Sequence, residues 1–149
     1  MYQCLGNYEK AIEFHQQSLS VAKEIGDKGT EGTAYTNLGA ACTRLGNYEK
    51  AIEFHRQSLS IAKDLRDKNT EGTAYTNLGA AYRCLGNYEK AIKFHHQSLS
   101  VAKQIGDKGT EGIAYTNFGA ACTCLGNYEE AIEFHRQSLS IAKDLREFP

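Results

Sequence analysis

The chain has 149 residues, of which 41% are hydrophobic and 23% charged, a composition too apolar for a disordered chain and suited to a helical protein. Lys and Arg number 17 against 18 Asp and Glu, with no long run of like charges, so we expect no nucleic-acid partner, which would need a clustered basic face. No stretch resembles a membrane span or a signal peptide, which predicts a cytoplasmic protein with no membrane partner.

A repeat of 40 residues dominates the sequence. The phrase Leu-Gly-Asn-Tyr-Glu recurs without insertion or deletion, beginning at Leu5, Leu45, Leu85 and Leu125. A second period of 80 residues is also visible, because alternate units share the phrases that begin at Val21 and Val101 or at Ile61 and Ile141. Repetition of this kind predicts stacked helical units, and the near-identical copies mean that a recurring residue is not by itself evidence of function.

In chain order, the sequence begins late in a first helix, where Tyr2 matches Tyr82 and Leu5 matches Leu85. We therefore expect a short stub of a first helix and then a second helix, followed by three complete helix pairs. The last second helix should run from Asn127 to about Arg146. Since residues 125–146 differ from 45–66 only in having Glu130 for Lys50, the last helix keeps an interior type of apolar face.

The second helix of each unit has a broad apolar face, which predicts packing on two neighbours. In one unit the face is formed by Tyr48, Ala51, Ile52, His55, Ser58, Leu59, Ala62 and Leu65, widened by Phe54 and Ile61. The first helix carries a narrower stripe with small residues around it, formed by Tyr35, Leu38, Cys42 and Leu45 with Ala34, Gly39 and Ala41. Gly39 and Ala51 should let the two backbones approach closely.

Helix ends are marked by residues that favour them. Gly46 suits the left-handed end of one helix, and Asn47 suits the cap of the next. At the other junction Asp27 and Thr30 compete as caps, and Asp27 is preferred. That choice leaves Gly32 inside a helix, at a cost of about 1 kcal/mol relative to Ala.

These residues resemble the tetratricopeptide repeat (TPR) family, whose unit reads Trp-x2-Leu-Gly-x2-Tyr and then Ala-x3-Phe. The frame is met by Tyr75, Leu78, Gly79 and Tyr82, and by Ala91 with a histidine at the Phe position. The departures are Tyr for Trp, that histidine, no closing proline and six extra residues per unit. The longer unit is similar to that of Partner-of-Inscuteable-type adaptors and kinesin light chains.

The resemblance implies an all-α, right-handed α-solenoid of antiparallel helix pairs. We expect residues 1–149 to form a single array with units starting near 5, 45, 85 and 125, the first and last incomplete. The uncapped ends predict a fragment of a longer array or self-association through those ends.

Histidine and cysteine patterns favour packing over chemistry. His15, His55, His95 and His135 recur every 40 residues, too far apart along a stack to share a metal ion, so we expect packed histidines and no metal site. The adjacent His95 and His96 do not form a chelating pair. The cysteines should be reduced thiols, namely Cys4, Cys42, Cys84, Cys122 and Cys124. No phosphate-binding loop, dinucleotide-binding turn or nucleophile elbow occurs, so we predict no enzyme and no cofactor.

The resemblance also implies a binding groove lined by the first helices. Its predicted residues are Thr33, Thr36, Asn37, Ala40, Thr43, Arg44, Thr73, Thr76, Asn77, Ala80, Arg83, Thr116, Asn117, Ala120 and Thr123. The Lys and Arg clamp with which chaperone adaptors hold a terminal carboxylate is absent. Instead, Asn37, Asn77 and Asn117 could form a ladder along an extended peptide backbone.

We therefore predict a protein-binding scaffold that holds a peptide or partner segment in this groove. Three alternatives stay open: a purely architectural or self-associating spacer, a regulatory array within a larger multidomain protein, and recognition on the convex face. The units differ most on the second helices, at Glu13, Glu53 and Lys93 and at Gln16, Arg56 and His96. Recognition of a partner on the convex face therefore stays an alternative to binding in the groove. Units also differ at Arg44, Cys84 and Cys124.

Overall fold

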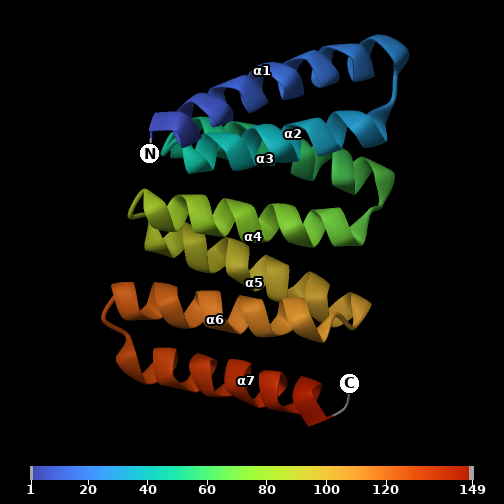
Figure 1. Cartoon of the computed structure of the whole chain (residues 1–149). Coiled ribbons are helices and arrows are strands. Elements are labelled where there is room, and N and C mark those ends of the chain that lie inside the picture. Colours follow the sequence, from blue (N-terminus) through green and yellow to red (C-terminus); the bar gives the residue numbers. More distant parts are fainter. Residues whose placement is uncertain (1, 148–149) are drawn as a thin grey trace. The chain divides into compact units, whose positions relative to one another are not determined.

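The computed structural model describes residues 2–147, with side chains placed for residues 6–146. Every element in residues 2–147 is an α-helix, and the helices recur with the period of the sequence (Figure 1). They are α1 (Tyr2–Ile25), α2 (Lys28–Arg44), α3 (Tyr48–Leu65), α4 (Lys68–Cys84), α5 (Tyr88–Ile105), α6 (Lys108–Cys124) and α7 (Tyr128–Glu147). The predicted all-α repeat of helix pairs is confirmed.

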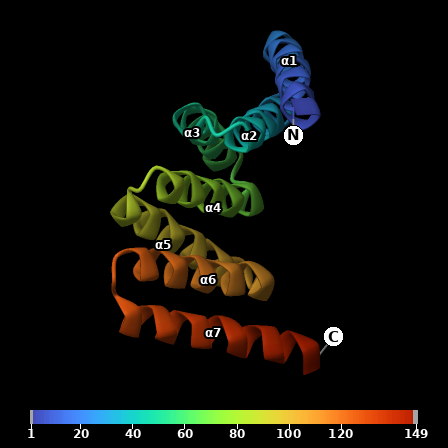
Figure 2. The same cartoon turned by 60° about the vertical axis from the view of Figure 1, so that its left-hand side comes forward.

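The chain divides into two compact units, Met1–Ala74 and Tyr75–Pro149, with the boundary inside α4. In the first unit α2 packs on both α1 and α3. In the second unit α6 packs on both α5 and α7, and the two views show α6 and α7 side by side (Figures 1 and 2). A first-type helix thus lies between two second-type helices in each unit.

Caps fix the helix boundaries as predicted. The carboxylate of Asp27 accepts a hydrogen bond from the backbone N–H of Thr30 at 3.1 Å, so α2 begins at the preferred Asp27 cap. The side chain of Asn47 accepts from the backbone of Lys50 at 3.3 Å and begins α3. Between them Gly46 has a φ of +80°, the left-handed conformation that ends α2 and that glycine adopts without strain.

Close helix packing explains the glycines inside α2. A Cβ on Gly39 would overlap the imidazole ring of His55, and a Cβ on Gly32 would lie 3.1 Å from Cγ2 of Ile61. Both glycines are buried, so the helix propensity that they cost is offset by the close contact of α2 with α3. The same pairing of glycine with histidine occurs in the second unit, at Gly79 with His95.

The predicted stub at the start of the chain is wrong. Helix α1 runs without a break from Tyr2 to Ile25, through Gly6, which corresponds to Gly46. At Gly46 the turn is held by a preceding helix that packs on the next one, and the Asn47 N–H donates to the carbonyl of Cys42 at 2.9 Å. Residues 2–5 are too few to form a packed partner, so extending α1 gains more backbone hydrogen bonds than turning would.

Candidate functional site

In the first unit, part of the predicted groove forms a polar hollow of about 230 Å³ between α2 and the start of α4. It is lined by Thr33, Thr36, Asn37, Asn69, Thr70 and Thr73. Four of these were predicted from the sequence. Asn69 and Thr70 were missed, although they precede Thr73 by about one helical turn and so share its face. The remaining predicted residues of this unit, Ala40, Thr43 and Arg44, lie further along α2, with Ala40 and Arg44 exposed and Thr43 half-buried.

The threonines of the groove direct their hydroxyl groups to their own helix or to the partner helix. Thr33 donates to the Gly29 carbonyl at 3.1 Å, and Thr43 donates to the Gly39 carbonyl at 2.9 Å. The Thr36 hydroxyl lies 2.7 Å from the hydroxyl of Ser58 on α3. These residues therefore offer a ligand methyl groups and acceptor oxygens more readily than free donors.

The asparagines of the groove are different. The side chains of Asn37, Asn77 and Asn117 are half-buried, and none of them forms a hydrogen bond within the described residues. Each amide carries both a donor and an acceptor, so it can pair with the C=O and the N–H of a peptide backbone at once. These amides are therefore the half-buried polar groups of the predicted groove that the fold leaves unpaired.

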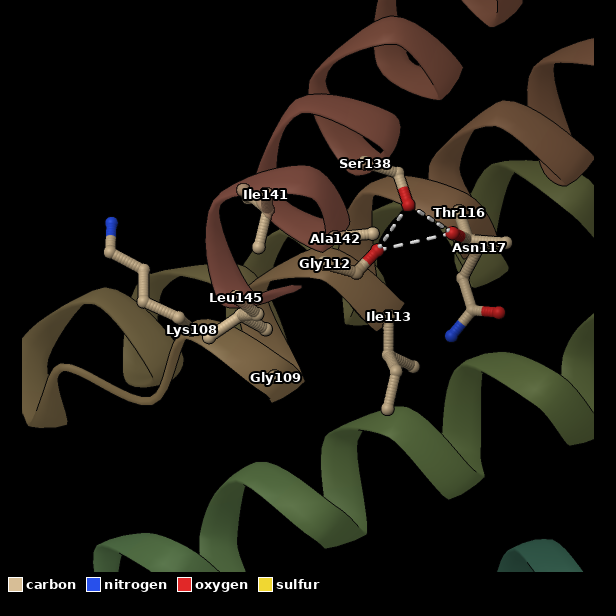
Figure 3. Close-up of a pocket in the computed structure, with 10 residues that line it drawn as sticks. All are labelled: Lys108, Gly109, Gly112, Ile113, Thr116, Asn117, Ser138, Ile141, Ala142 and Leu145. Atoms are coloured by element: carbon tan, nitrogen blue, oxygen red, sulfur yellow. Dashed lines mark hydrogen bonds between the residues drawn. The ribbon is translucent and has the colours of Figure 1, made fainter. Parts of the chain in front are cut away.

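In the second unit the predicted residues lie on two helices. Thr76, Asn77, Ala80 and Arg83 are half-buried on α4, and Asn117 and Ala120 are half-buried on α6, where Thr116 and Thr123 are exposed. Thr116 and Asn117 line a hollow of about 270 Å³ at the α6–α7 pair (Figure 3). The other lining residues are Lys108, Gly109, Gly112, Ile113, Ser138, Ile141, Ala142 and Leu145. The sequence prediction missed this hollow.

Ile113 changes the character of the groove at α6. It occupies the position of Thr33 and Thr73, and its side chain is 54% exposed. Ile113 and Asn117 extend from the same side of α6, away from Ser138 (Figure 3). The change from Thr to Ile is the signal in the sequence that could have identified this apolar position.

Two of the repeated histidines are packed as predicted. His55 and His95 are 2% and 1% exposed, and burial lowers the pKa of each to about 4, helped at His95 by the nearby Arg83 charge. Within the described residues, both ring nitrogens of His95 and the Nδ1 of His55 lack a hydrogen-bond partner. The ring of His135 lies against Gly119 in the same way, although its side chain is exposed, and His15 is half-buried. The neutral rings of His55 and His95, each lying against a glycine, therefore serve to pack the helices together.

The cysteines are free thiols in two environments. Cys42 and Cys122 are buried, while Cys84 and Cys124 are exposed; the side chain of Cys4 lies outside the described residues. Burial raises the pKa of the Cys42 thiol, and burial together with Glu130 raises that of Cys122. Both buried thiols are therefore held in the protonated, unreactive form.

Buried carboxylates at the start of the first helices were also missed. Glu31, Glu71 and Glu111 are each 7% exposed, and each pairs with the lysine three residues earlier at 3.1–3.3 Å. Within the described residues no group of three or more His, Cys, Asp or Glu side chains could hold a metal ion, and no helix is long and apolar enough to cross a membrane. The carboxylates thus form ion pairs at helix starts.

Comparisons with known proteins agree with this architecture. BtubC (BKLC) from P. vanneervenii has a similar structure, with a TM-score of 0.88 and 20% sequence identity over 97% of this chain and 60% of that one. A STAND protein with a tetratricopeptide repeat sensor from Pyrococcus horikoshii gives a TM-score of 0.87 and 26% identity over 97% of this chain and 22% of that one. A putative kinesin light chain from Podosopora anserina, with nearly identical TPR-like repeats, gives a TM-score of 0.77. Its sequence identity is 17%, over 97% of this chain and 71% of that one.

The chain therefore spans about three-fifths of the length of the first of these proteins and about one-fifth of the second. No curated protein matches the sequence significantly. The family model described as tetratricopeptide repeat matches residues 1–64 and 70–144, which is nearly the whole chain. The chain belongs to the tetratricopeptide repeat family.

Proposed function

We propose that the protein is a non-catalytic scaffold that binds an extended peptide segment along its first helices. The observation that carries the proposal is the set of half-buried, unpaired amides of Asn37, Asn77 and Asn117. The threonines beside them already use their hydroxyl protons within the fold. The amides are thus the natural partners of a backbone whose own N–H and C=O groups are unpaired, as in an extended segment.

The predicted ligand is recognised more by its backbone than by its charge. The lining is Thr, Asn and Ala with Arg44 and Arg83 near the helix ends, so it lacks a dense cationic clamp for a terminal carboxylate. Ile113 adds an apolar contact beside Asn117. We therefore expect a neutral extended segment that carries an apolar side chain at one position.

A random peptide library displayed on phage tests this proposal without a known partner. Peptides selected on the intact chain should lose about a hundredfold in affinity when Asn37, Asn77 and Asn117 are all changed to Ala, because each lost pair of hydrogen bonds costs about 1 kcal/mol. The matched control changes three exposed glutamines on the second helices to Ala, namely Gln17, Gln57 and Gln97. Unchanged binding to the asparagine variant, or equal losses in both variants, would contradict the groove and favour the convex face.

Self-association is a second candidate, favoured by exposed apolar side chains on α1 and α7. Phe14 and Ile25 on α1 are 68% and 70% exposed, and Leu139 on α7 is 63% exposed. Sedimentation velocity at increasing concentration distinguishes the two: a spacer that stacks on itself should show a rising sedimentation coefficient.

A regulatory array within a larger protein is a third candidate. It is supported by the 26% identity to the STAND protein that carries a tetratricopeptide repeat sensor. If this is correct, a ligand of the groove should change the activity of an attached domain. A cytoplasmic location and the lack of a nucleic-acid partner stay predictions from the sequence.

A further inference from the structure

The polar hollow of the first unit contains a residue that the corresponding helices lack. Asn69 lies in the first turn of α4, whereas the matching residues in the first turns of α2 and α6 are Gly29 and Gly109. The side chain of Asn69 lines the hollow of about 230 Å³ together with that of Asn37 on α2. It therefore adds a second amide group to the lining, which a glycine cannot do.

The hydroxyl groups of the lining offer a ligand mainly acceptor oxygens. Thr70 donates its hydroxyl proton to Asp67 at 2.6 Å, and Thr73 donates to the backbone carbonyl of Asn69 at 3.1 Å. The two threonines that α2 contributes likewise donate to carbonyl groups of their own helix. A hydroxyl group has one proton and two lone pairs, so each of these oxygens keeps a lone pair for a donor on the ligand.

The amides of Asn37 and Asn69 supply the donors of the lining. Neither side chain forms a hydrogen bond within the part of the chain that the structure describes. Each amide has an NH2 group with two donors and a carbonyl oxygen that accepts. The hollow thus presents more acceptors than donors, and none of its lining residues is charged.

Charged and aliphatic ligand groups fit this lining poorly. Thr33 and Thr70 also line a smaller hollow of about 60 Å³, which Asp67 borders. Hydrogen bonds from Thr70 hold the pKa of Asp67 below its usual value, so its negative charge at neutral pH repels an acidic group. Both Asp67 oxygens already accept from Thr70, and an ammonium group has no acceptor for the two asparagine amides, so a lysine loses hydration without full replacement. An aliphatic side chain leaves the whole lining without partners.

We propose that this hollow binds a primary carboxamide, the side chain of an Asn or Gln in the peptide ligand. A carboxamide has two donors for the hydroxyl and carbonyl oxygens and an acceptor for the NH2 group of Asn69, so it matches both kinds of group at once. The proposal rests on the peptide-binding function proposed above, with Asn37 pairing with the ligand backbone and Asn69 with its side chain. Because glycine replaces Asn69 at the starts of α2 and α6, the preference belongs to one place in the groove and fixes the register of the ligand.

Blocked amino acids test the hollow without a known peptide. N-acetylglutamine N-methylamide is titrated into the intact, isotope-labelled chain and followed by NMR, with the leucine, lysine and glutamate compounds for comparison. The glutamine compound should shift the side-chain amide signals of Asn69 and bind at least about fivefold more tightly than the others, because it makes at least one more hydrogen bond. Asn69→Gly should abolish this preference, whereas Gln57→Ala, at an exposed position on α3, should retain it. No saturable shift, equal binding of the four compounds, or a preference that survives Asn69→Gly would overturn the proposal.

A peptide selected on the intact chain separates this proposal from the proposed function. Each position of the peptide is changed in turn to Gln, Asn, Leu, Lys and Glu, and binding is measured with the parent chain and with Asn69→Gly. One position should favour a carboxamide at least about fivefold in the parent chain alone. A peptide that needs Asn37, Asn77 and Asn117 but has no such position would overturn this inference and leave the proposed function standing. Binding that ignores those three asparagines, while the blocked glutamine still needs Asn69, would contradict the proposed function and support the hollow.

Discussion

Acidification should destabilise the fold through the two histidines that are packed over glycines. The imidazole of His95 lies against Gly79, with the ring of Phe118 at 6.3 Å between centroids and the charge of Arg83 nearby. His55 lies against Gly39 in the same way. Each ring is almost fully buried, so a proton on it would place a charge in a site with no compensating partner.

The size of the effect follows from the pKa difference. Burial lowers the pKa of both histidines from 6.5 to about 4, so the unfolded chain takes up protons first as the pH falls. Stability is thus fully present above pH 6.5 and is lost progressively down to about pH 4. At about pH 5 the loss is about 2 kcal/mol for each histidine, and below the folded pKa it reaches about 3 kcal/mol.

Urea unfolding followed by circular dichroism between about pH 7.5 and pH 5 measures this loss. The variants His55→Phe and His95→Phe replace a titrating ring by one that does not titrate. Each should remove about 2 kcal/mol of the difference between the two pH values. His135→Gln serves as the control, because His135 occupies the corresponding position on α7 and is exposed.

An equal pH dependence of the free energy of unfolding in the parent chain and in the phenylalanine variants would contradict this prediction. So would a loss of pH dependence in His135→Gln as large as that in either phenylalanine variant. Should Phe prove too large for the contact with glycine, His→Leu provides the same test with a smaller side chain, since only the loss of titration is being compared.

Four further substitutions test the packing and the helix ends, each by urea unfolding at neutral pH. Gly79→Ala should lower the free energy of unfolding by about 1–2 kcal/mol because the new Cβ overlaps the His95 ring, whereas Gly6→Ala, with no atom within 4 Å of the new Cβ, should raise it by about 1 kcal/mol. Arg66→Gly should raise it by about 1 kcal/mol, because Arg66 has a φ of 57° and glycine relieves that strain. Asp67→Ala should lower it by about 1 kcal/mol by removing the cap of α4, and a result within error of the parent would show that the cap contributes nothing.

Local features of the fold were predictable from the sequence because short-range chemistry decides them. The caps Asp27 and Asn47 and the left-handed Gly46 depend on side chains within about one turn, and all three are found as predicted. The close approach at Gly39 followed from the small stripe on the first helix. The pattern did not predict which group contacts Gly39, and the structure shows that it is the imidazole ring of His55.

Features that depend on neighbouring helices could not be predicted from one unit. The sequence places the same residue type at His55 and His135, yet one is buried and the other exposed, because exposure depends on whether another helix covers the face. The unbroken α1 has the same origin: Gly6 ends a helix only where a complete helix precedes it. Thr36 was predicted to line the groove, but the contact of its hydroxyl with Ser58 could not be predicted, because it requires a partner across the helix pair.

Because the units are nearly identical in sequence, a difference between corresponding residues shows the effect of their surroundings. Asn37 and Asn117 occupy the same position in their units, yet Asn37 lines a hollow of threonines and asparagines, while Asn117 lies beside the exposed Ile113 that replaces Thr33. A ligand that meets only the shared amide would bind the two sites alike. A ligand that also carries an apolar side chain should favour the α6 site, and Ile113→Thr should remove that preference while leaving the binding of a purely polar ligand unchanged. Equal losses for both ligands would instead mean that Ile113 supports the position of α6.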